Sequence, residues 1–330
     1  MACSGFAAPA RGAGFVTHPF VWRRLIVSIS LAFCLSAGHA RAATIYATGQ
    51  NNGDPSHTSG NYYYAIDTTT GKATAISPLI NGSTPAGLAS SGDGRLLGFK
   101  DGQVGEVNPV AGTFTPSTPS NGLSITGFDV VNGFGYGIPT TGSDRRLQRI
   151  DLTTGAASPL GTGNPIGSAL DTYFGDAPGT NSPFVISLGS VGGSLYGVHL
   201  GSGKNNLIQF DTSTGNAIVI GAPNAVATSG NPGAGSYSGF AALTGVDENG
   251  DGTYDALFGN VNFYDPDAGG PLASQRLGGL VRYNLADGTW TLVGTNPGLI
   301  FFGFGSIVPA PSATALAAVG ALAFARRRRT

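Results

Sequence analysis

The sequence predicts an all-β protein, a β-propeller of four-stranded antiparallel blades, from a repeated hairpin and from its composition. The stretch Leu207–Gly221 holds two apolar runs around Asp-Thr-Ser-Thr-Gly, which suits two strands and a tight turn. The chain of 330 residues has 54 Gly, 20 Pro, 11% charged and 41% hydrophobic residues, as expected for short strands around a core. Similar hairpins occur at Ala65–Ala73, Leu147–Ala157, Val281–Gly294 and, more loosely, Gly105–Phe114.

The spacing of the turn glycines predicts the number of blades. The first two intervals, 41 and 43 residues, match a four-stranded blade, whereas the next two, 60 and 73, need insertions. Gly- and Pro-rich segments at 161–183, 223–235 and 265–275 supply those insertions. We therefore predict five blades, or six if an insertion hides another unit, with an open β-sandwich or solenoid as the alternative. The five turn glycines are Gly71, Gly112, Gly155, Gly215 and Gly288.

The predicted strands follow the same order in successive units. The first unit has only three strands, and one apolar segment at 299–307 belongs to no unit. Because a ring hides the exposed edges of its sheets, we predict that residues near Phe304 pair with residues near Tyr46 and complete the first blade. The predicted strands are 44–48, 61–66 and 73–76; then 86–89, 95–99, 103–107 and 112–115; then 125–130, 133–137, 147–150 and 156–160; then 184–188, 194–198 and the hairpin 207–221.

The N-terminus has the pattern of a secretory signal, with an apolar helix. Arg23 and Arg24 precede an apolar run at 25–35, and small residues follow it. We predict that residues 1–42 are a signal peptide cut by signal peptidase, and that translation starts at Val21 because the segment before Arg23 is unusually long. The predicted cleavage site is Ala40, Ala42 and Ala43.

Removal of the signal changes the redox and charge properties of the chain. Cys3 and Cys34 both lie in the signal, so the exported domain has no disulfide. Residues 43–307 contain 9 Lys or Arg and 18 Asp or Glu, a net charge of −9, whereas the whole chain has −1. This acidic balance argues against nucleic acid and anionic membranes as partners.

The C-terminus joins a proline motif, an apolar helix at 313–325 and an arginine cluster. Its thirteen apolar residues are fewer than the roughly 20 that cross a bilayer comfortably, although a positive end favours the cytoplasmic side. An ordinary tail anchor, a transmembrane helix, is the alternative to a sorting signal. The motif residues are Val308, Pro309, Ala310, Pro311, Arg326, Arg327, Arg328 and Arg329.

This order of parts resembles the PEP-CTERM family of bacterial sorting signals, in which an exosortase recognises a Val-Pro-Glu-Pro-type motif, a short helix and arginines. The resemblance implies that 308–330 is a sorting signal and that the protein contacts a membrane only through this segment, before processing. Ala310 stands where the family usually has Glu. Most of residues 44–307 resemble bacterial secreted propellers whose blades carry an aromatic-x-x-Asp-x-x-Thr-Gly turn.

One acidic loop, residues 247–255, has oxygen side chains at alternate positions followed by a glycine bend. The Glu that closes an EF-hand is absent, because Phe258 stands there. The loop resembles the Asp-x-Asn-x-Asp-Gly-x-x-Asp loop of FG-GAP repeats, which implies a single structural Ca²⁺. A metal-free acidic turn is the alternative. The implied ligands are Asp247, Asn249, Asp251, the carbonyl of Thr253, and Asp255.

Catalytic patterns are scarce. His57 and His199 do not form a metal spacing, and we expect both on the surface or in loops. The repeated Asp67, Asp151 and Asp211 are expected to cap turns rather than act as paired acids. Aromatic pairs are candidates for sugar stacking, with core packing as the alternative. These are Tyr62-Tyr63-Tyr64, Tyr173-Phe174, Phe263-Tyr264 and Trp290.

These patterns predict a secreted, non-enzymatic propeller at the cell surface or in the extracellular matrix of a Gram-negative-type bacterium, with exopolysaccharide or surface proteins as partners. One alternative is an extracellular carbohydrate-active hydrolase or lyase that uses the central funnel, and another is a calcium-dependent adhesin. A funnel with several convergent acids, His or Arg favours the enzyme, whereas Gly, Ser and small apolar residues favour a scaffold.

Overall fold

The computed structural model describes most of residues 43–307, and there the chain forms strands and turns and no helix. Accordingly, none of the described segments is a helix that could cross a bilayer. The flanking helices predicted at both ends of the chain lie outside these residues. The described residues are 43–51, 60–79, 84–140, 146–161, 184–200, 206–222, 237–239, 242–264 and 276–307.

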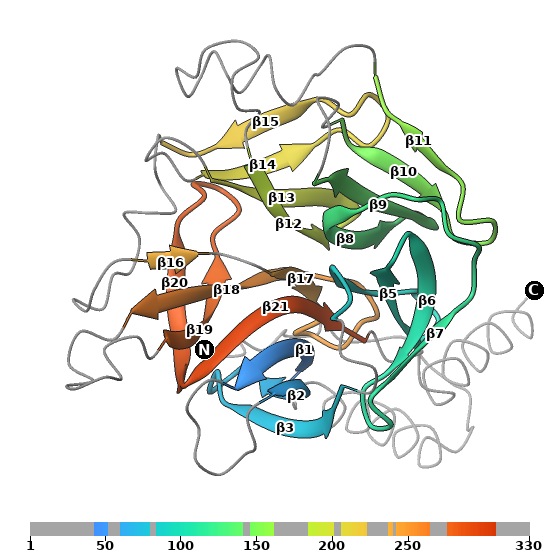
Figure 1. Ribbon diagram of the computed structural model, residues 1–330. Helices are drawn as coiled ribbons and strands as arrows, with labels where there is room; N and C mark the ends of the chain where they lie inside the picture. The colour runs from blue at the N-terminus through green and yellow to red at the C-terminus, as the bar shows by residue number, and fades with distance from the viewer. Residues whose placement is uncertain are drawn as a thin grey trace, which may run out of the picture. The chain divides into compact units, whose positions relative to one another are not determined.

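The strands form five antiparallel sheets, the blades of a propeller, arranged in a ring (Figure 1). Blade 1 is β21 (Leu299–Ser306), β1 (Thr44–Asn51), β2 (Gly60–Asp67) and β3 (Ala73–Pro78). Blade 2 is β4 (Leu88–Ser90), β5 (Leu96–Lys100), β6 (Gln103–Asn108) and β7 (Thr113–Pro116). Blade 3 is β8 (Ile125–Val131), β9 (Phe134–Pro139), β10 (Gln148–Asp151) and β11 (Ala157–Pro159).

Blade 4 is β12 (Phe184–Val191), β13 (Ser194–Leu200), β14 (Asn206–Phe210) and β15 (Ala217–Ile220). Blade 5 is β18 (Ala256–Tyr264), β19 (Arg276–Tyr283) and β20 (Trp290–Pro297), with β16 (Tyr237–Gly239) and β17 (Leu243–Val246) sharing the innermost place beside β18. The innermost strands β21, β4, β8, β12 and β17 each contact the next, and β17 contacts β21. The ring therefore closes with five blades, so six blades, a sandwich and a solenoid are wrong.

Blade 1 is completed from the two ends of the described chain. Strand β21 pairs with β1 in an antiparallel register that sets Phe304 opposite Ala47 and Gly305 opposite Tyr46. This confirms the predicted closure. Phe301 and Phe304 of β21 are buried between blades 1 and 5, where the Phe301 ring lies 5.8 Å from Tyr64 and 5.4 Å from Phe304 between centroids.

Each repeated turn, between the third and fourth strands of a blade, is shaped by its first side chain. Asp67 Oδ1 accepts the backbone N–H of Thr69 at 2.8 Å and of Thr70 at 3.0 Å. Asn108 and Asp151 do the same in their turns, and Asp211 and Asn284 each accept the backbone N–H two residues on. Hydrogen bonds, first of all from the Ser213 hydroxyl, lower the pKa of Asp211 to about 2. The expectation that these aspartates cap turns is confirmed.

The glycine that ends each repeated turn contacts the preceding blade. All five have a left-handed backbone, with φ between 67° and 76°. A Cβ on Gly112 would lie 2.2 Å from the carbonyl oxygen of Pro78 in β3, and one on Gly288 would lie 2.6 Å from that of Ile220 in β15. Gly71, Gly155 and Gly215 make the corresponding contacts in the remaining three gaps. We call these five turns and the outermost strand ends that they touch the rim.

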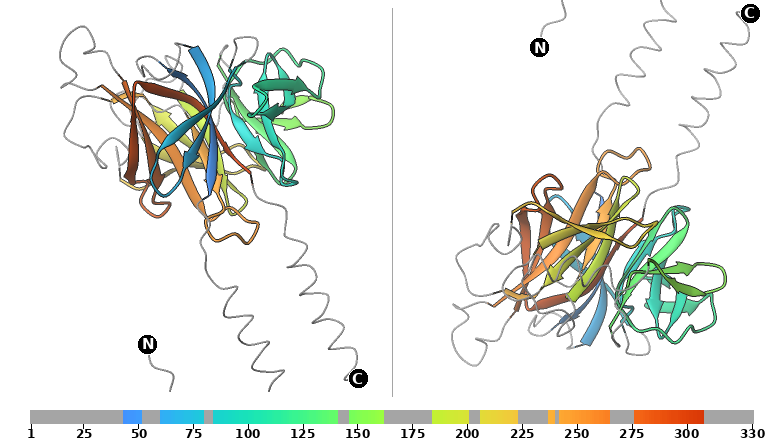
Figure 2. Two further views of the ribbon diagram at one scale, coloured as in Figure 1. Left: turned by 90° about the horizontal axis from the view of Figure 1, so that it is seen from below. Right: turned by 90° about the horizontal axis from the view of Figure 1, so that it is seen from above.

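The two faces of the ring carry different connections. Because neighbouring strands are antiparallel, the repeated turns share one face with the turns that leave the innermost strands, at 91–95, 132–133, 192–193 and 247–255. Figure 2 shows the 247–255 loop projecting from this face. Ala43 and Ile307 lie beside each other here, since Ile45 pairs with Ser306. The long connections between strands begin and end on the opposite face.

Candidate functional site

Among the described residues, the centre of the ring, where an enzyme of this fold would need a funnel, is closely packed. The space on the axis measures about 10 Å³, roughly the room that one water needs. Adjacent innermost strands approach closely because they carry glycine: a Cβ on Gly87 would lie 2.5 Å from the Phe128 nitrogen. The lining residues, which with the innermost strands we call the hub, are Ala86, Gly87, Gly127, Phe128, Ser187, Leu188, Ala242, Leu243, Gly303 and Phe304.

Hydroxyl side chains of the hub satisfy carbonyl groups of neighbouring blades. An innermost strand has no pairing strand on its axial side, so buried polar groups of its backbone need other partners. The Thr126 hydroxyl donates to the Val185 carbonyl at 2.7 Å, and the Ser190 hydroxyl donates back to the Val130 carbonyl at 3.4 Å. These bonds cross between blades 3 and 4. The hub is therefore a packed and hydrogen-bonded centre.

Asp129 is a buried carboxylic acid of the hub, on β8, and is 4% exposed. Burial raises its pKa to about 7, against the opposing effect of hydrogen bonds from the Ser190 side chain and from the backbone of Val130 and Ser190. Its Oδ2 atom has no hydrogen-bond partner within the described part of the chain. A carboxyl group that titrates near neutrality thus lies between blades 3 and 4.

The acidic loop 247–255 joins β17 to β18 within blade 5, as the FG-GAP resemblance implies. Asp247 Oδ1 accepts the N–H of Gly250 at 2.6 Å and of Asp251 at 3.2 Å, and its Oδ2 accepts that of Gly252 at 2.8 Å. Asp255 Oδ1 accepts the N–H of Glu248 at 2.9 Å. The loop is therefore organised by its own carboxylates.

The residues predicted to bind calcium also make hydrogen bonds within the loop. Asn249 Oδ1 accepts the Asp251 N–H, and the Thr253 hydroxyl and N–H lower the pKa of Asp251. Among the described residues no three His, Cys, Asp or Glu side chains are grouped to hold a metal. The donors are oxygen atoms, the type that Ca²⁺ prefers, and a carboxylate has about four lone-pair sites, so the bonded oxygens retain capacity for a cation. The calcium site stays a prediction.

Tyr254, near the end of this loop, connects blade 5 to three other blades. Its hydroxyl donates to the carbonyl of Ser306 in blade 1 at 3.0 Å and hydrogen-bonds Ser90 in blade 2. Its own carbonyl accepts the N–H of Gly192 in blade 4 at 3.0 Å. Burial raises the pKa of Tyr254 to about 12. The acidic loop thus holds an aromatic side chain at the end of the hub on the turn face.

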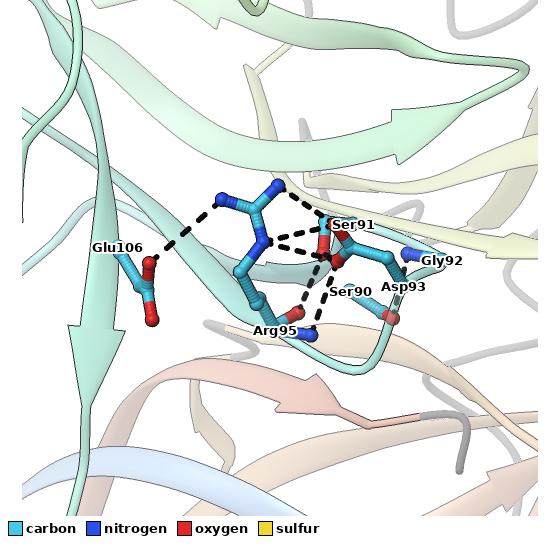
Figure 3. Close-up of polar contacts among 6 residues, drawn as sticks. All are labelled: Ser90, Ser91, Gly92, Asp93, Arg95 and Glu106. Atoms are coloured by element: carbon cyan, nitrogen blue, oxygen red, sulfur yellow. Dashed lines mark hydrogen bonds and ion pairs between the residues drawn. The ribbon is translucent and has the colours of Figure 1, made fainter. Parts of the chain in front are cut away.

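A polar turn after Ser90 is one of the turns on the same face. Figure 3 shows its side chains and their contacts. The Ser90 hydroxyl accepts the N–H of Gly92 at 3.1 Å. The Arg95 guanidinium is 2.8 Å from Asp93 and 3.8 Å from Glu106, and all three side chains are about half exposed. Exposed ion pairs contribute little to stability. This cluster therefore shapes a turn and gives no sign of a reactive site.

A recess of about 520 Å³ lies on blade 5 beside the acidic loop. Its charged groups include Arg282, which is 2.6 Å from Glu248, and the exposed Asp255. Buried Tyr283 and Trp290 contribute to its floor. The guanidinium is already paired with Glu248 and Tyr283 is buried, so the recess offers no free cation at Arg282.

Several residues that the sequence suggested for binding or for the surface are buried in the structure. Tyr63, Tyr64 and Trp290 are at most 2% exposed, so sugar stacking by them is wrong and core packing is right. His199 is fully buried on β13, so its expected surface or loop position is also wrong. His57, Tyr173, Phe174, the cleavage residues before Ala43 and the sorting signal 308–330 lie outside the described residues.

Sequence reasoning did not find Asp129 or Tyr254. Asp129 is a lone acid in an apolar strand, which was the available signal. Tyr254 lies among the predicted calcium ligands and drew no separate prediction, because its partners are 52 residues away at Ser306 and in other blades.

Comparisons with known proteins give distant structural similarities. No protein-family model and no curated protein sequence matches the chain. Among solved structures, TolB from Acinetobacter baumannii has 11% identity and a TM-score of 0.40, over 84% of this chain and 71% of TolB. A quinonprotein alcohol dehydrogenase-like protein from Bacteroides thetaiotaomicron has 10% identity and a TM-score of 0.35, over 82% and 69%. Similarities at this level supply no functional assignment.

Proposed function

We propose that residues 43–307 are a non-enzymatic β-propeller that is exported and acts as a binding or structural component at the surface, or in the extracellular matrix, of a Gram-negative-type bacterium. The observation that carries this proposal is the closed hub, which is lined by Gly, Ala, Ser, Leu and Phe. A catalytic funnel requires accessible, convergent reactive groups. Asp129, an acid on the innermost strand β8, is buried and so supports a scaffold.

The rival is a carbohydrate-active hydrolase or lyase. A binding screen of the exported domain against exopolysaccharides and isolated surface proteins, run beside a reducing-end assay on each bound polysaccharide, separates the two. Saturable binding without new reducing ends or unsaturated products supports the proposal. Turnover of any bound polysaccharide would overturn it, and an Asp129→Asn variant would then show whether the hub is involved.

Export and sorting are part of the proposal. The signal pattern at 1–42 and the PEP-CTERM-like order at 308–330 support it, together with the adjacent positions of Ala43 and Ile307 on one face, which leave the ring intact when both segments are removed. Mass spectrometry of the protein recovered from cells and medium tests this. We expect a first residue at Ala43 and loss of the arginine cluster. An intact precursor in the cytoplasm would contradict it.

We further propose one structural Ca²⁺ in the acidic loop, held by Asp247, Asn249, Asp251, the Thr253 carbonyl and Asp255. The oxygen donors on a single nine-residue loop support it. The melting temperature should rise with added calcium and fall with EDTA, and Asp251→Asn should remove the response, whereas Asp151→Asn in a rim turn should keep it. Melting that is unchanged by calcium and EDTA would remove the metal claim.

The adhesin alternative requires that partner binding depends on the calcium site. If the acidic loop contacts a partner protein through its metal, EDTA abolishes binding in the same screen. Binding that survives EDTA, while the melting temperature falls, assigns the metal to stability alone.

A further inference from the structure

We propose that Tyr254 is a latch that keeps the ring closed, by holding the last residue of the C-terminal strand β21 in the hub. The proposal is independent of calcium. It rests on the contacts of the tyrosine hydroxyl, on the position of its partner Ser306 in the closing strand, and on the way the acidic loop fixes the tyrosine.

Strand β21 is the strand that closes the ring. It belongs to blade 1, yet it follows blade 5 in sequence and reaches β1 only through long-range pairing. Its pairing with β1 ends at Ser306 opposite Ile45. Because the ends of a strand fray before its middle, opening of the ring is expected to begin at Ser306.

Two hydrogen bonds hold Ser306 from blade 5. The Tyr254 hydroxyl donates to its carbonyl at 3.0 Å, and the Ser306 hydroxyl donates to the Gly245 carbonyl at 2.5 Å. Gly245 also packs against the tyrosine ring, since a Cβ there would lie 2.8 Å from Tyr254 Cγ. Tyr254, Gly245 and Ser306 therefore form one contact unit across the gap between blades 5 and 1.

Backbone hydrogen bonds to blade 4 and to β17 hold the acidic loop on both sides of Tyr254. The Tyr254 carbonyl accepts the Gly192 N–H at 3.0 Å, and the next residue, Asp255, donates its N–H to the Val246 carbonyl at 3.0 Å. The hydroxyl is thus presented at a fixed distance from β21, so little conformational entropy is lost when the bond forms. Tyr254 is a positioning residue for the closing strand.

The latch adds a role to the proposed function, and this role rests on the proposed display of the protein through its C-terminal segment. A mechanical force on that segment acts on the ring at Ile307, directly after Ser306, the residue that Tyr254 holds. Tyr254 then resists separation of β21 from β1 at the end where unzipping starts.

Hydrogen–deuterium exchange of the full-length chain tests the latch. In Tyr254→Phe the ring packing is kept and the hydroxyl is lost, and we expect amides of 299–306 to exchange about tenfold faster, as for a hydrogen bond worth about 1.4 kcal/mol. Tyr283→Phe is the matched control, because Tyr283 is buried in the same blade and its hydroxyl has no partner within the described residues. Its exchange at 299–306 should equal that of the wild type.

Ser306→Ala is the second variant, which keeps the carbonyl acceptor and removes the bond to Gly245. It should also accelerate exchange at 299–306 while blades 2 and 3 keep their wild-type rates. Unchanged exchange in both variants, or equal acceleration in every blade, would overturn the latch. The measurement does not depend on export, so failure of the proposed localisation leaves its result intact.

Discussion

The rim and the hub both bring neighbouring blades into contact, but they do so in different ways. All five gaps at the rim share one contact, that of the left-handed glycine of the repeated turn with the outermost strand of the preceding blade or the residues just after it. Side chains such as Ser77 and Asn296 add hydrogen bonds in single gaps. In the hub the blades supply three residue types on the turn face, and each residue has its own partners: Ser306, Ser90, Asp129, Ser190 and Tyr254.

The difference shows which contacts follow from the sequence repeat and which depend on individual residues. A rim contact needs only a turn and the absence of a Cβ, so one local motif serves all five gaps. The innermost strands converge, and each meets a different neighbour there, so hub groups are individual. We therefore expect rim substitutions to act alike in every blade and hub substitutions to act through specific partners.

Removal of the closing strand should have the largest effect. A chain that ends at Gly298 lacks Phe301 and Phe304, whose loss costs about 3–5 kcal/mol each, a large part of a typical stability of about 5–15 kcal/mol. We expect it not to fold by circular dichroism, whereas a chain that ends at Ile307 unfolds cooperatively in urea. A folded product ending at Gly298 would show that the hub does not need β21.

Asp129 should give the hub a pH dependence that the rim lacks. The pKa of Asp129 in the folded protein, about 7, lies above the ordinary 3.8. Its contribution to the free energy of unfolding is therefore fully present below pH 4 and is lost as the pH rises to 7. The loss amounts to about 4 kcal/mol at 1.36 kcal/mol per pKa unit. Asp129→Asn should flatten the urea stability between pH 4 and 8. Equal slopes in both proteins would contradict this, and Asp151→Asn, with a lowered pKa, should keep the wild-type slope.

Substitution of a rim glycine by alanine should lower the free energy of unfolding by about 3 kcal/mol. In Gly112→Ala the left-handed backbone adds about 1–2 kcal/mol and the clash with Pro78 about 1–3 kcal/mol. Gly122→Ala is the control, because its φ is 74° and no atom lies within 4 Å of the added Cβ. The difference between the two variants in urea unfolding isolates the contact between blades, and no difference would remove the rim contact as a source of stability.

Loss of one rim cap should give the smallest effect. Asn108 Oδ1 accepts the N–H groups of Val110 and Ala111 at 3.1 and 2.9 Å in an exposed turn. Asn108→Ala should lower the unfolding free energy by about 1 kcal/mol, and Asn108→Asp should restore it because a carboxylate caps the same turn elsewhere. A loss above that of Gly112→Ala would show that the cap, rather than the glycine, joins the blades.

The fold was predictable in detail because the signals are local and recur. The turn at Asp211–Gly215 and its copies mark the third and fourth strands of each blade, and the strand at 299–307 without a unit predicts closure with Tyr46. The hub was not predictable, since Asp129 and Tyr254 take their roles from partners in other blades. The acidic loop is intermediate: its ligand pattern is local, but its contact with Ser306 is not.

By itself the sequence determined that this chain is a ring of short hairpins, because turn glycines, capping side chains and strand periodicity act within a few residues. Only the tertiary structure decided that the axis is closed, that an acid is buried beside it, and that Tyr254 reaches the closing strand. Those features depend on which strands converge, and convergence is a property of the whole ring that no short stretch of chain encodes.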